Sequence, residues 1–484
     1  MPLPRVLRFW DLTLLIIGTV IGSGIFLVPA SVLRNAHGRV GLAFGVWIAG
    51  GILSLLGALS YGELSARVPE AGGLYIYIRD GFGPLPAFLY GWTLFFLISS
   101  GSVATLAVAF SMYLGGVVPL SPLLGKLVAI GMIAVLATVN VLGTRRGANL
   151  QNYATAIKVI GVLGMAVALL WFAHPHPQAA TSSAPASTTD LLKGFGLAMI
   201  SVLWAYEGWQ YCTFSAGETL NPHQTFPRAL AVGTLALVAI YVLVNVGYIH
   251  ALGVARAEAS ESIAAAAIAT VFGSKAASAV SLAILISMFG AANGLTLTSP
   301  RVYYAMAKDR LFFRKLAEVH PRFQTPAFAI VASSIWAALL AASGTFEQLL
   351  TYVVFSSWMF YALGAAALFI YRKGNPEQKL AYEVPGYPWT PAIFILAAIA
   401  LVLNTAWAQP LRALIGFLLI ASGLPAFFLW RRRARSELPV PEEAMTTTGH
   451  KALTAAGRNS VVMATGATNP GCSREAEGES PAQE

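Results

Sequence analysis

The sequence predicts an all-α membrane protein built from two inverted repeats of helices. Apolar residues make up 57% of its 484 residues and charged residues only 11%, less than half of the roughly 25% found in soluble domains. Long segments without any Asp, Glu, Lys or Arg recur along the chain, and many reach the roughly 18 residues that cross a bilayer as a helix. A polytopic membrane protein is therefore expected, and most soluble folds are excluded.

We expect twelve transmembrane helices. Their approximate bounds are residues 10–33, 40–64, 82–115, 122–143, 151–173, 191–215, 227–252, 274–306, 324–343, 346–371, 388–408 and 411–431. The uncharged run 81–125 is too long for one helix. Pro119 and Pro122 divide it, because proline interrupts a helix interior.

Lys and Arg are distributed unevenly between the two sets of loops. If the N-terminus is inside, the inside segments before residue 436 hold 20 of these residues and the outside segments hold seven. Because Lys and Arg accumulate in cytoplasmic loops, we expect both termini in the cytoplasm and the protein in the cell membrane. The net charge of +10 then reflects topology, and no nucleic-acid partner is expected.

The composition changes abruptly at residue 436. The last 49 residues, 436–484, contain ten charged residues and no Phe, Tyr or Trp, which is too little apolar surface to order a chain. We therefore expect a membrane domain over residues 1–435, followed by a disordered cytoplasmic tail.

Two expected helices carry interruptions near mid-membrane. The first contains Gly22, Ser23 and Gly24, and the sixth contains Glu207 followed by Gly208. Glycine costs a helix about 1 kcal/mol relative to alanine, so both helices are expected to break there. Small residues also allow close helix packing, which is the alternative interpretation of the first motif.

The interruptions open two blocks of five helices each, at about 9–173 and 191–371, with two additional helices over about 388–431. Because five is an odd number, the second block enters the membrane from the opposite side. The blocks are therefore predicted to be inverted repeats whose broken first helices face each other at the midplane.

Broken helices expose backbone groups that can bind a zwitterion. The start of one half-helix offers N–H groups to a carboxylate, and the end of another offers carbonyl groups to an ammonium. An amino acid carries both charges a few ångströms apart. The residue pattern therefore predicts a transporter domain for an amino-acid-like solute.

At this point a family resemblance becomes specific. The motif GTVIGSGIF at residues 18–26 resembles the first-helix motif of the amino acid–polyamine–organocation superfamily, and the L-type amino acid transporter branch most closely. Supporting motifs lie at residues 59–64, 71–77, 217–222 and 289–294. The resemblance implies a five-plus-five inverted repeat, alternating access, and exchange or proton-coupled uptake of L-amino acids.

The resemblance also implies a binding site. Val20, Ser23 and Gly24 would hold the substrate carboxylate, while the backbone near Trp204 and Ala205 would receive the amine. Trp204 also occupies the position of an aromatic gate, although aromatic residues in membrane helices often serve packing alone. The full predicted set of substrate-binding residues is Val20, Ile21, Gly22, Ser23, Gly24, Trp204, Ala205 and Glu207.

Lys158 is an ionisable residue inside the fifth expected helix, and such residues are functional candidates. In the resembling family a lysine there takes the place of a sodium ion beside the first helix. Lys158 is therefore predicted to make transport independent of sodium. Its position about two turns from Arg145 and Arg146 also permits snorkelling toward the membrane surface.

Glu207 departs from the L-type pattern, which has a small residue at the matching position. It could carry a coupling proton, pair with Lys158, or bind a cationic amino acid or a polyamine. A structural role, in which Glu207 caps the broken helix, is equally open. The sequence thus predicts neutral substrates but leaves cationic ones as the alternative.

Other features exclude or limit alternatives. The histidines show no metal-ligand spacing, and no intramembrane base accompanies Ser23, so neither an enzyme nor a cofactor is expected. A sensor or channel on the same scaffold is a further alternative. Because residues 115–126 contain no cysteine, no disulfide-linked partner is expected. Pocket residues from the third, eighth and tenth helices cannot be placed from sequence; candidates are Ser102, Asn293, Phe355 and Met359.

Overall fold

The computed structural model describes residues 3–116, 118–174, 187–260, 262–343, 346–374, 382–408 and 410–436. These residues are helical apart from short connections and one isolated β-bridge between Leu7 and Thr219. The helices are α1 Phe9–Val20, α2 Gly24–Asn35, α3 Val40–Arg67, α4 Leu74–Phe82, α5 Pro84–Thr93, the π-helix η1 Leu94–Ile98, α6 Ser99–Gly115, α7 Pro122–Val141, α8 Thr144–Phe172, α9 Thr188–Ala205, the 3₁₀-helix η2 Trp209–Glu218, α10 Pro222–Ala259, α11 Ile263–Phe272, α12 Ser274–Thr298, α13 Pro300–Lys308, the 3₁₀-helix η3 Arg314–Ala317, α14 Ala327–Ser343, α15 Phe346–Gly374, α16 Trp389–Ala408, α17 Pro410–Ala421 and α18 Gly423–Ser436. The all-helical prediction is confirmed.

Eight helical segments in the described part of the chain are long and apolar enough to cross a membrane, and the bent pair α1 and α2 would make nine. A multi-pass membrane protein is therefore confirmed, whereas the count of twelve remains a prediction. Each expected range contains a helix, and five ranges hold more than one: 10–33, 82–115, 191–215, 274–306 and 411–431. The range 274–306 holds α12 and α13. Pro300 starts α13, because its missing N–H is tolerated at a helix start.

Backbone contacts divide the chain into two units, Met1–Ala434 and Arg435–Glu484. The tail predicted over 436–484 lies outside the described residues except for Ser436. Its disorder and its cytoplasmic location therefore remain predictions.

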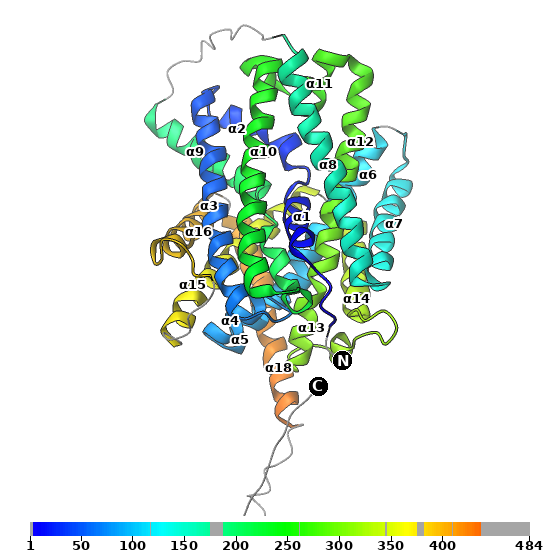
Figure 1. The fold of residues 1–484 in the computed structure, drawn as a ribbon, viewed down its shortest axis with the longest axis vertical. Helices are drawn as coiled ribbons and strands as arrows, with labels where there is room; N and C mark the ends of the chain where they lie inside the picture. Colours follow the sequence, from blue (N-terminus) through cyan, green and yellow to red (C-terminus); the bar gives the residue numbers. More distant parts are fainter. Residues whose placement is uncertain are drawn as a thin grey trace, which may run out of the picture. The chain divides into compact units, whose positions relative to one another are not determined.

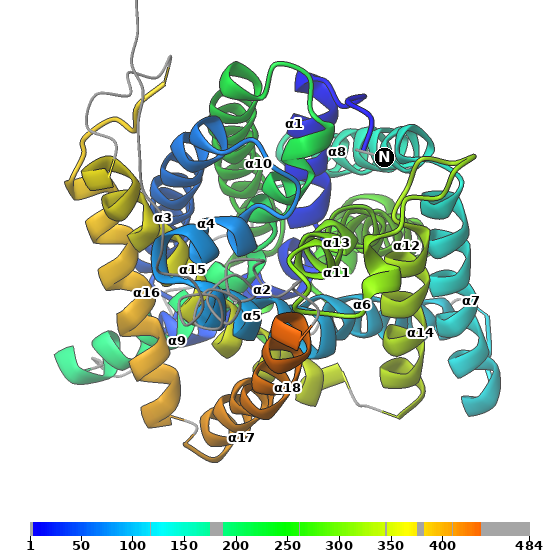
Figure 2. The ribbon, with the colours of Figure 1, turned by 90° about the horizontal axis from the view of Figure 1, so that it is seen from below.

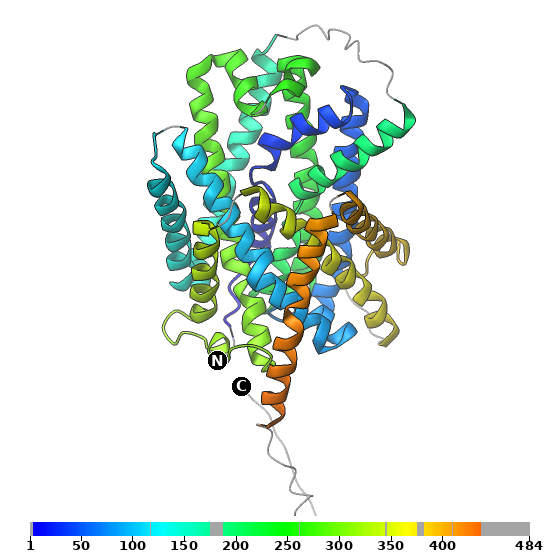
Figure 3. The same cartoon turned by 180° about the vertical axis from the view of Figure 1, so that it is seen from behind.

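Helix α1 lies among the long helices α8, α10 and α12 (Figure 1, Figure 2). Helices α7 and α14 pack together at one edge of the bundle, and α16 and α17 lie at another (Figure 2). The segment Pro84–Gly115 crosses the bundle obliquely (Figure 3) and brings α6 against α12. This arrangement surrounds the break between α1 and α2 with helices on several sides.

The first expected span is broken, as predicted. Helix α1 ends at Val20, α2 begins at Gly24, and their axes differ by 48°. Ile21 leaves the helical region with ψ of 87°, and the Gly22 N–H bonds to the Val20 carbonyl at 2.8 Å. This short-range bond replaces the usual bond four residues back, so the α-helical pattern stops within one residue.

The sixth expected span is also interrupted, after Ala205. Gly208 has φ of 131°, a conformation that L side chains rarely adopt, and the 3₁₀-helix η2 follows. A Cβ at Gly208 would lie 3.1 Å from the backbone of Thr19 and of Val20. The two interruptions therefore meet backbone to backbone, and only glycine fits the contact.

Candidate functional site

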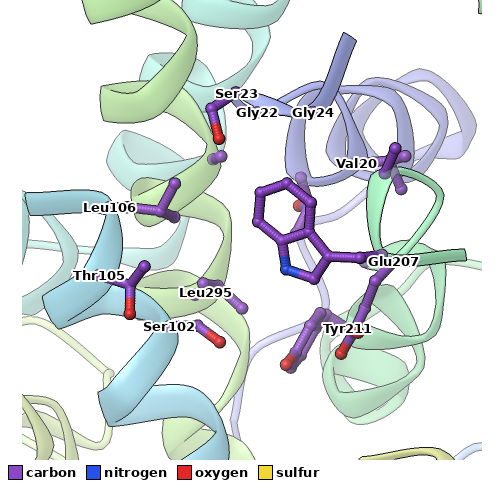
Figure 4. Close-up of a pocket in the computed structure, with 15 residues that line it drawn as sticks. Val20, Gly22, Ser23, Gly24, Ser102, Thr105, Leu106, Glu207, Tyr211 and Leu295 are labelled. Carbon is purple, nitrogen blue, oxygen red and sulfur yellow. The ribbon is translucent and has the colours of Figure 1, made fainter. Parts of the chain in front are cut away.

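A cavity of about 80 Å³ lies where the two interruptions meet. A water molecule needs roughly 10–15 Å³ on this measure, so the cavity has room for several water-sized groups. Its lining residues are Thr19, Val20, Gly22, Ser23, Gly24, Ser102, Thr105, Leu106, Trp204, Ala205, Glu207, Gly208, Tyr211, Ala291 and Leu295. In Figure 4, Ser23 lies above the cavity, Leu106, Thr105 and Ser102 on the left, and Glu207 and Tyr211 on the right. The structure thus brings together every predicted binding residue except Ile21.

Ile21 is buried and does not line the cavity. Its side chain packs in the core, and its carbonyl oxygen accepts hydrogen bonds from Lys158 and Ser287 instead. The unwound segment therefore presents Gly22, Ser23 and Gly24 to the cavity and turns the Ile21 carbonyl toward its other side.

The start of α2 suits an anionic group. The Ser23 hydroxyl is buried and makes no hydrogen bond within the described residues. It precedes the N-terminus of α2, where the helix dipole favours negative charge. A Cβ at Gly24 would lie 2.9 Å from the Ala205 Cβ, so this glycine allows the two interrupted helices to approach closely. A carboxylate at this point would meet a free hydroxyl and the positive end of a helix.

Lys158 neutralises the opposite end of the same break. Its side chain is 2% exposed, and Nζ donates to the carbonyl oxygens of Gly18 at 2.7 Å, Ile21 at 2.8 Å and Ser287 at 3.0 Å. Three acceptors use all three N–H groups of an ammonium. Lys158 therefore neither snorkels to the membrane surface nor pairs with Glu207, two of the alternatives considered from the sequence.

Ser287 of α12 supports the same carbonyl groups. Its hydroxyl lies 2.8 Å from the Ile21 carbonyl oxygen and 3.0 Å from that of Gly22. Together, Lys158 and Ser287 satisfy carbonyls at the end of α1 that lose their helical donors where the helix stops. No local pattern marks Ser287, because the partners of its hydroxyl are more than 260 residues away.

Glu207 bonds within its own side of the cavity. Tyr361 of α15 donates its hydroxyl to Glu207 Oε1 at 2.8 Å. The Gln210 amide also bonds to the Tyr361 hydroxyl, and its oxygen accepts the Gly208 N–H at 3.2 Å. Glu207 Oε2 is buried without a hydrogen bond in the described part of the chain. The Ser357 side chain also lies within hydrogen-bonding reach of this carboxyl group, and Oε2 is able to accept a further bond.

Tyr241 of α10 links the ends of both interrupted helices. Its hydroxyl lies 2.9 Å from the Ala205 carbonyl oxygen and 3.2 Å from the Val20 carbonyl oxygen. These are the last residues of α9 and α1. Sequence reasoning missed Tyr241, because a tyrosine in an apolar helix gives no sign of its distant partners.

The four residues that could not be placed from sequence separate into three groups. Ser102 lines the cavity together with Thr105 and Leu106 of the same helix. Asn293 instead bonds to Gln151 and to the Gly147 carbonyl and accepts a bond from Asn140. Met359 does not line the cavity, and the Phe355 side chain lies outside the described residues.

The comparisons with known proteins agree over most of the chain. A family model described as "Amino acid permease" matches residues 7–429. The serine/threonine exchanger SteT of Bacillus subtilis is 32% identical over 425 residues, which cover 87% of this chain and 96% of that protein. The human b(0,+)-type amino acid transporter 1 is 32% identical, covering 86% of each chain. The mouse large neutral amino acids transporter small subunit 2 is 29% identical, covering 87% of this chain and 80% of that protein. The chain therefore belongs to the amino acid permease family of the amino acid–polyamine–organocation superfamily, whose members are transporters and not enzymes.

Proposed function

We propose that this permease is a sodium-independent carrier of neutral L-amino acids that works by alternating access. The observation that carries the proposal is the position of Lys158. Its ammonium already occupies the acceptor site at the end of α1, bonded to three carbonyl oxygens. With a fixed positive charge there, no sodium ion is needed to neutralise the break. The carbonyl oxygens that could coordinate such an ion are already bonded to Lys158.

The substrate fits the two breaks in one orientation. Its carboxylate lies at Ser23 and the start of α2, where a free hydroxyl and the helix dipole favour an anion. Its ammonium lies toward the carbonyl ends of α1 and α9, near Val20, Ala205 and Glu207. Trp204 closes over the bound solute as the gate.

The cavity favours a small, uncharged side chain. Apart from Glu207, its lining consists of small and apolar residues, Trp204 and five hydroxyl-bearing residues: Thr19, Ser23, Ser102, Thr105 and Tyr211. The relative from Bacillus subtilis is named a serine/threonine exchanger, which supports small neutral amino acids as substrates here too.

The proposal extends to the architecture. The two breaks open repeats at about 9–173 and 191–371, inverted relative to each other within twelve membrane spans, with a cytoplasmic tail after residue 435. Both termini lie in the cytoplasm, and no disulfide-linked partner is needed. The uneven distribution of Lys and Arg supports this orientation.

A second candidate function rests on Glu207. Its carboxylate lines the cavity and keeps one oxygen without a hydrogen bond in the described residues. An ammonium or guanidinium of a cationic amino acid or a polyamine could pair with that oxygen. The same oxygen could instead take up a proton that is carried together with a neutral substrate.

Purified protein in proteoliposomes tests these functions. Vesicles are loaded with unlabelled amino acid and assayed for uptake of radiolabelled serine, leucine, lysine or putrescine, in sodium or choline buffer, with and without a proton gradient. We expect exchange of serine at the same rate in sodium and choline. A requirement for sodium would overturn the proposal, and uptake confined to lysine or putrescine would favour the alternative.

A further inference from the structure

A buried ion pair lies on the face of the protein where the N-terminal segment docks. Arg301, in α13, and Glu218, the last residue of η2, are both fully buried. Arg301 Nε donates to Glu218 Oε2 at 2.5 Å, and Nη2 donates to Oε1 at 3.0 Å. The Thr144 hydroxyl donates to Glu218 Oε1 at 2.6 Å and accepts from Arg301 Nη2 at 2.9 Å. We call these three side chains the Glu218 cluster.

The N-terminal segment is attached to the same point. The Glu218 carbonyl oxygen accepts the N–H groups of Val6 at 2.8 Å and Leu7 at 2.9 Å. The Leu7 carbonyl oxygen in turn accepts the Leu220 N–H at 2.9 Å. Four parts of the chain therefore meet here: the segment before α1, the start of α8, the end of η2 and the start of α13.

The cluster joins the far ends of the two segments that line the cavity. Helix α1 runs from this region to the first break at Val20, and η2 runs from the second break at Gly208 to Glu218. Leu7, which bonds to the Glu218 carbonyl, and Leu297, whose carbonyl accepts a bond from Arg301, are both buried, as is Ser215 of η2. While the cluster is intact, it fixes η2 and the segment before α1 to α8 and α13.

We propose that the Glu218 cluster is the contact that closes the N-terminal face during the transport cycle. This inference rests on the proposed alternating access. Glu218, Arg301 and Thr144 act as positioning residues: they hold α1 and η2 against α8 and α13 while the cavity is closed to this side. For the solute to leave on this side, the cluster must separate. Separating a buried ion pair leaves an uncompensated charge on each partner. A partly separated cluster is therefore unfavourable, and the contact is either fully formed or fully open.

The test uses one reporter cysteine behind the cluster. Ser215 is buried, lies three residues before Glu218, and is close in size to cysteine. The reporter protein carries Ser215→Cys together with Cys212→Ala and Cys472→Ser, which remove both native thiols. Its rate of alkylation by N-ethylmaleimide in proteoliposomes reports water access from the N-terminal face.

The cluster is weakened by Thr144→Val, which removes one hydroxyl and keeps the ion pair. The matched control is Thr298→Val, because that hydroxyl is also buried but, among the residues that the structure describes, bonds only to the Gly294 carbonyl of its own helix. We expect Thr144→Val to raise the alkylation rate about tenfold, since hydrogen bonds to charged groups are the stronger class. Thr144→Ser should restore slow alkylation, and Thr298→Val should leave it unchanged.

A second reporter, Ala264→Cys, distinguishes opening of the N-terminal face from a general loosening of the protein. Ala264 is buried in α11, which lies at the opposite end of the bundle from the N-terminus (Figure 1). Alkylation of both reporters in Thr144→Val, or equal rates in Thr144→Val and Thr298→Val, would overturn the inference. Because labelling needs no substrate, it can succeed even if none of the amino acids tested is exchanged, in which case only the proposed function fails.

Discussion

The two helix breaks border one cavity, but they are held by different chemistry. At the first break, the Lys158 ammonium and the Ser287 hydroxyl bond to carbonyl oxygens from Gly18 to Gly22. At the second break, Tyr361 bonds to Glu207, and Tyr241 bonds to the Ala205 carbonyl. The first break carries a fixed cation and the second carries a carboxylate. Under the proposed function, the carboxylate of a zwitterionic solute binds at the first break, and the second break decides which positive or neutral groups are accepted.

The largest effect is expected at the cation of the first break. Lys158→Ala would remove three hydrogen bonds from a buried ammonium to the carbonyl oxygens of Gly18, Ile21 and Ser287. Hydrogen bonds to charged groups contribute about 1.5–3 kcal/mol each, so transport should fall by at least about 100-fold. Lys158→Arg should also fail, because a planar guanidinium does not replace a compact ammonium.

Amino-acid counterflow in proteoliposomes measures this effect. Protein yield and elution on size exclusion serve as the folding control for both variants. Wild-type counterflow by Lys158→Ala would contradict the role of the ammonium, as would a sodium requirement in the unmodified protein.

The next largest effect separates two glycines of the first break. A Cβ at Gly24 would lie 2.9 Å from the Ala205 Cβ and 3.0 Å from its Cα, whereas a Cβ at Gly22 would meet nothing closer than 3.9 Å. Gly24→Leu should abolish substrate binding, and Gly24→Ala should weaken it strongly. Gly22→Ala is the matched control and should retain most binding. Equilibrium binding of radiolabelled serine to purified protein compares them, and equal affinity in Gly24→Leu and wild type would refute the close approach.

A moderate effect is expected at the carboxylate of the second break. If Glu207 carries a coupling proton, Glu207→Gln should preserve serine counterflow and remove the dependence of net uptake on pH. If it binds a cationic substrate, the same change should weaken lysine binding strongly and spare serine, because a desolvated charge partner is lost. Substrate panels at several pH values measure both outcomes.

Tyr361→Phe is the control for the Glu207 prediction. It removes the hydroxyl that bonds to Glu207 Oε1 while keeping the carboxylate. Identical pH profiles and substrate rankings in Glu207→Gln and wild type would leave Glu207 with a structural role only.

The smallest effect is expected at Tyr241. Tyr241→Phe removes one hydroxyl shared between the Ala205 and Val20 carbonyl oxygens. A neutral hydrogen bond contributes about 0.5–1.5 kcal/mol, so the KM for serine should change by less than about tenfold, with expression unchanged. A complete loss of transport would mean that the phenol does more than hold the two helix ends together.

The sequence was sufficient for features that depend on neighbouring residues. The glycines of the first break and Gly208 of the second mark the positions where regular helix stops, because their effect on the backbone is local. The all-helical membrane fold followed from composition and uncharged runs. Lys158 stood out as an ionisable residue inside an expected helix, and the family resemblance added the prediction that it takes the place of a sodium ion beside the first helix. The structure supplied its three acceptors.

Features that depend on distant residues were not predictable. Three hydroxyl groups bond to partners that are distant in the sequence: Tyr241 to Ala205 across 36 positions, Tyr361 to Glu207 across 154, and Ser287 to Ile21 across 266. Nothing in the local sequence marks these residues. Ile21 was placed with its neighbours in the binding site, although its carbonyl turns to the other side of α1. The direction of each backbone group in an unwound segment depends on torsion angles that a motif does not specify.

The contact at Gly208 has a mechanical consequence. Its backbone packs against Thr19 and Val20 with no side chain between them, and Tyr241 ties the end of α1 to the end of α9 beside it. With no compressible layer at this point, α1 and η2 cannot tilt independently of each other. Under the proposed alternating access, the two helices would turn together about this contact, so that a rotation that widens one entrance would narrow the other.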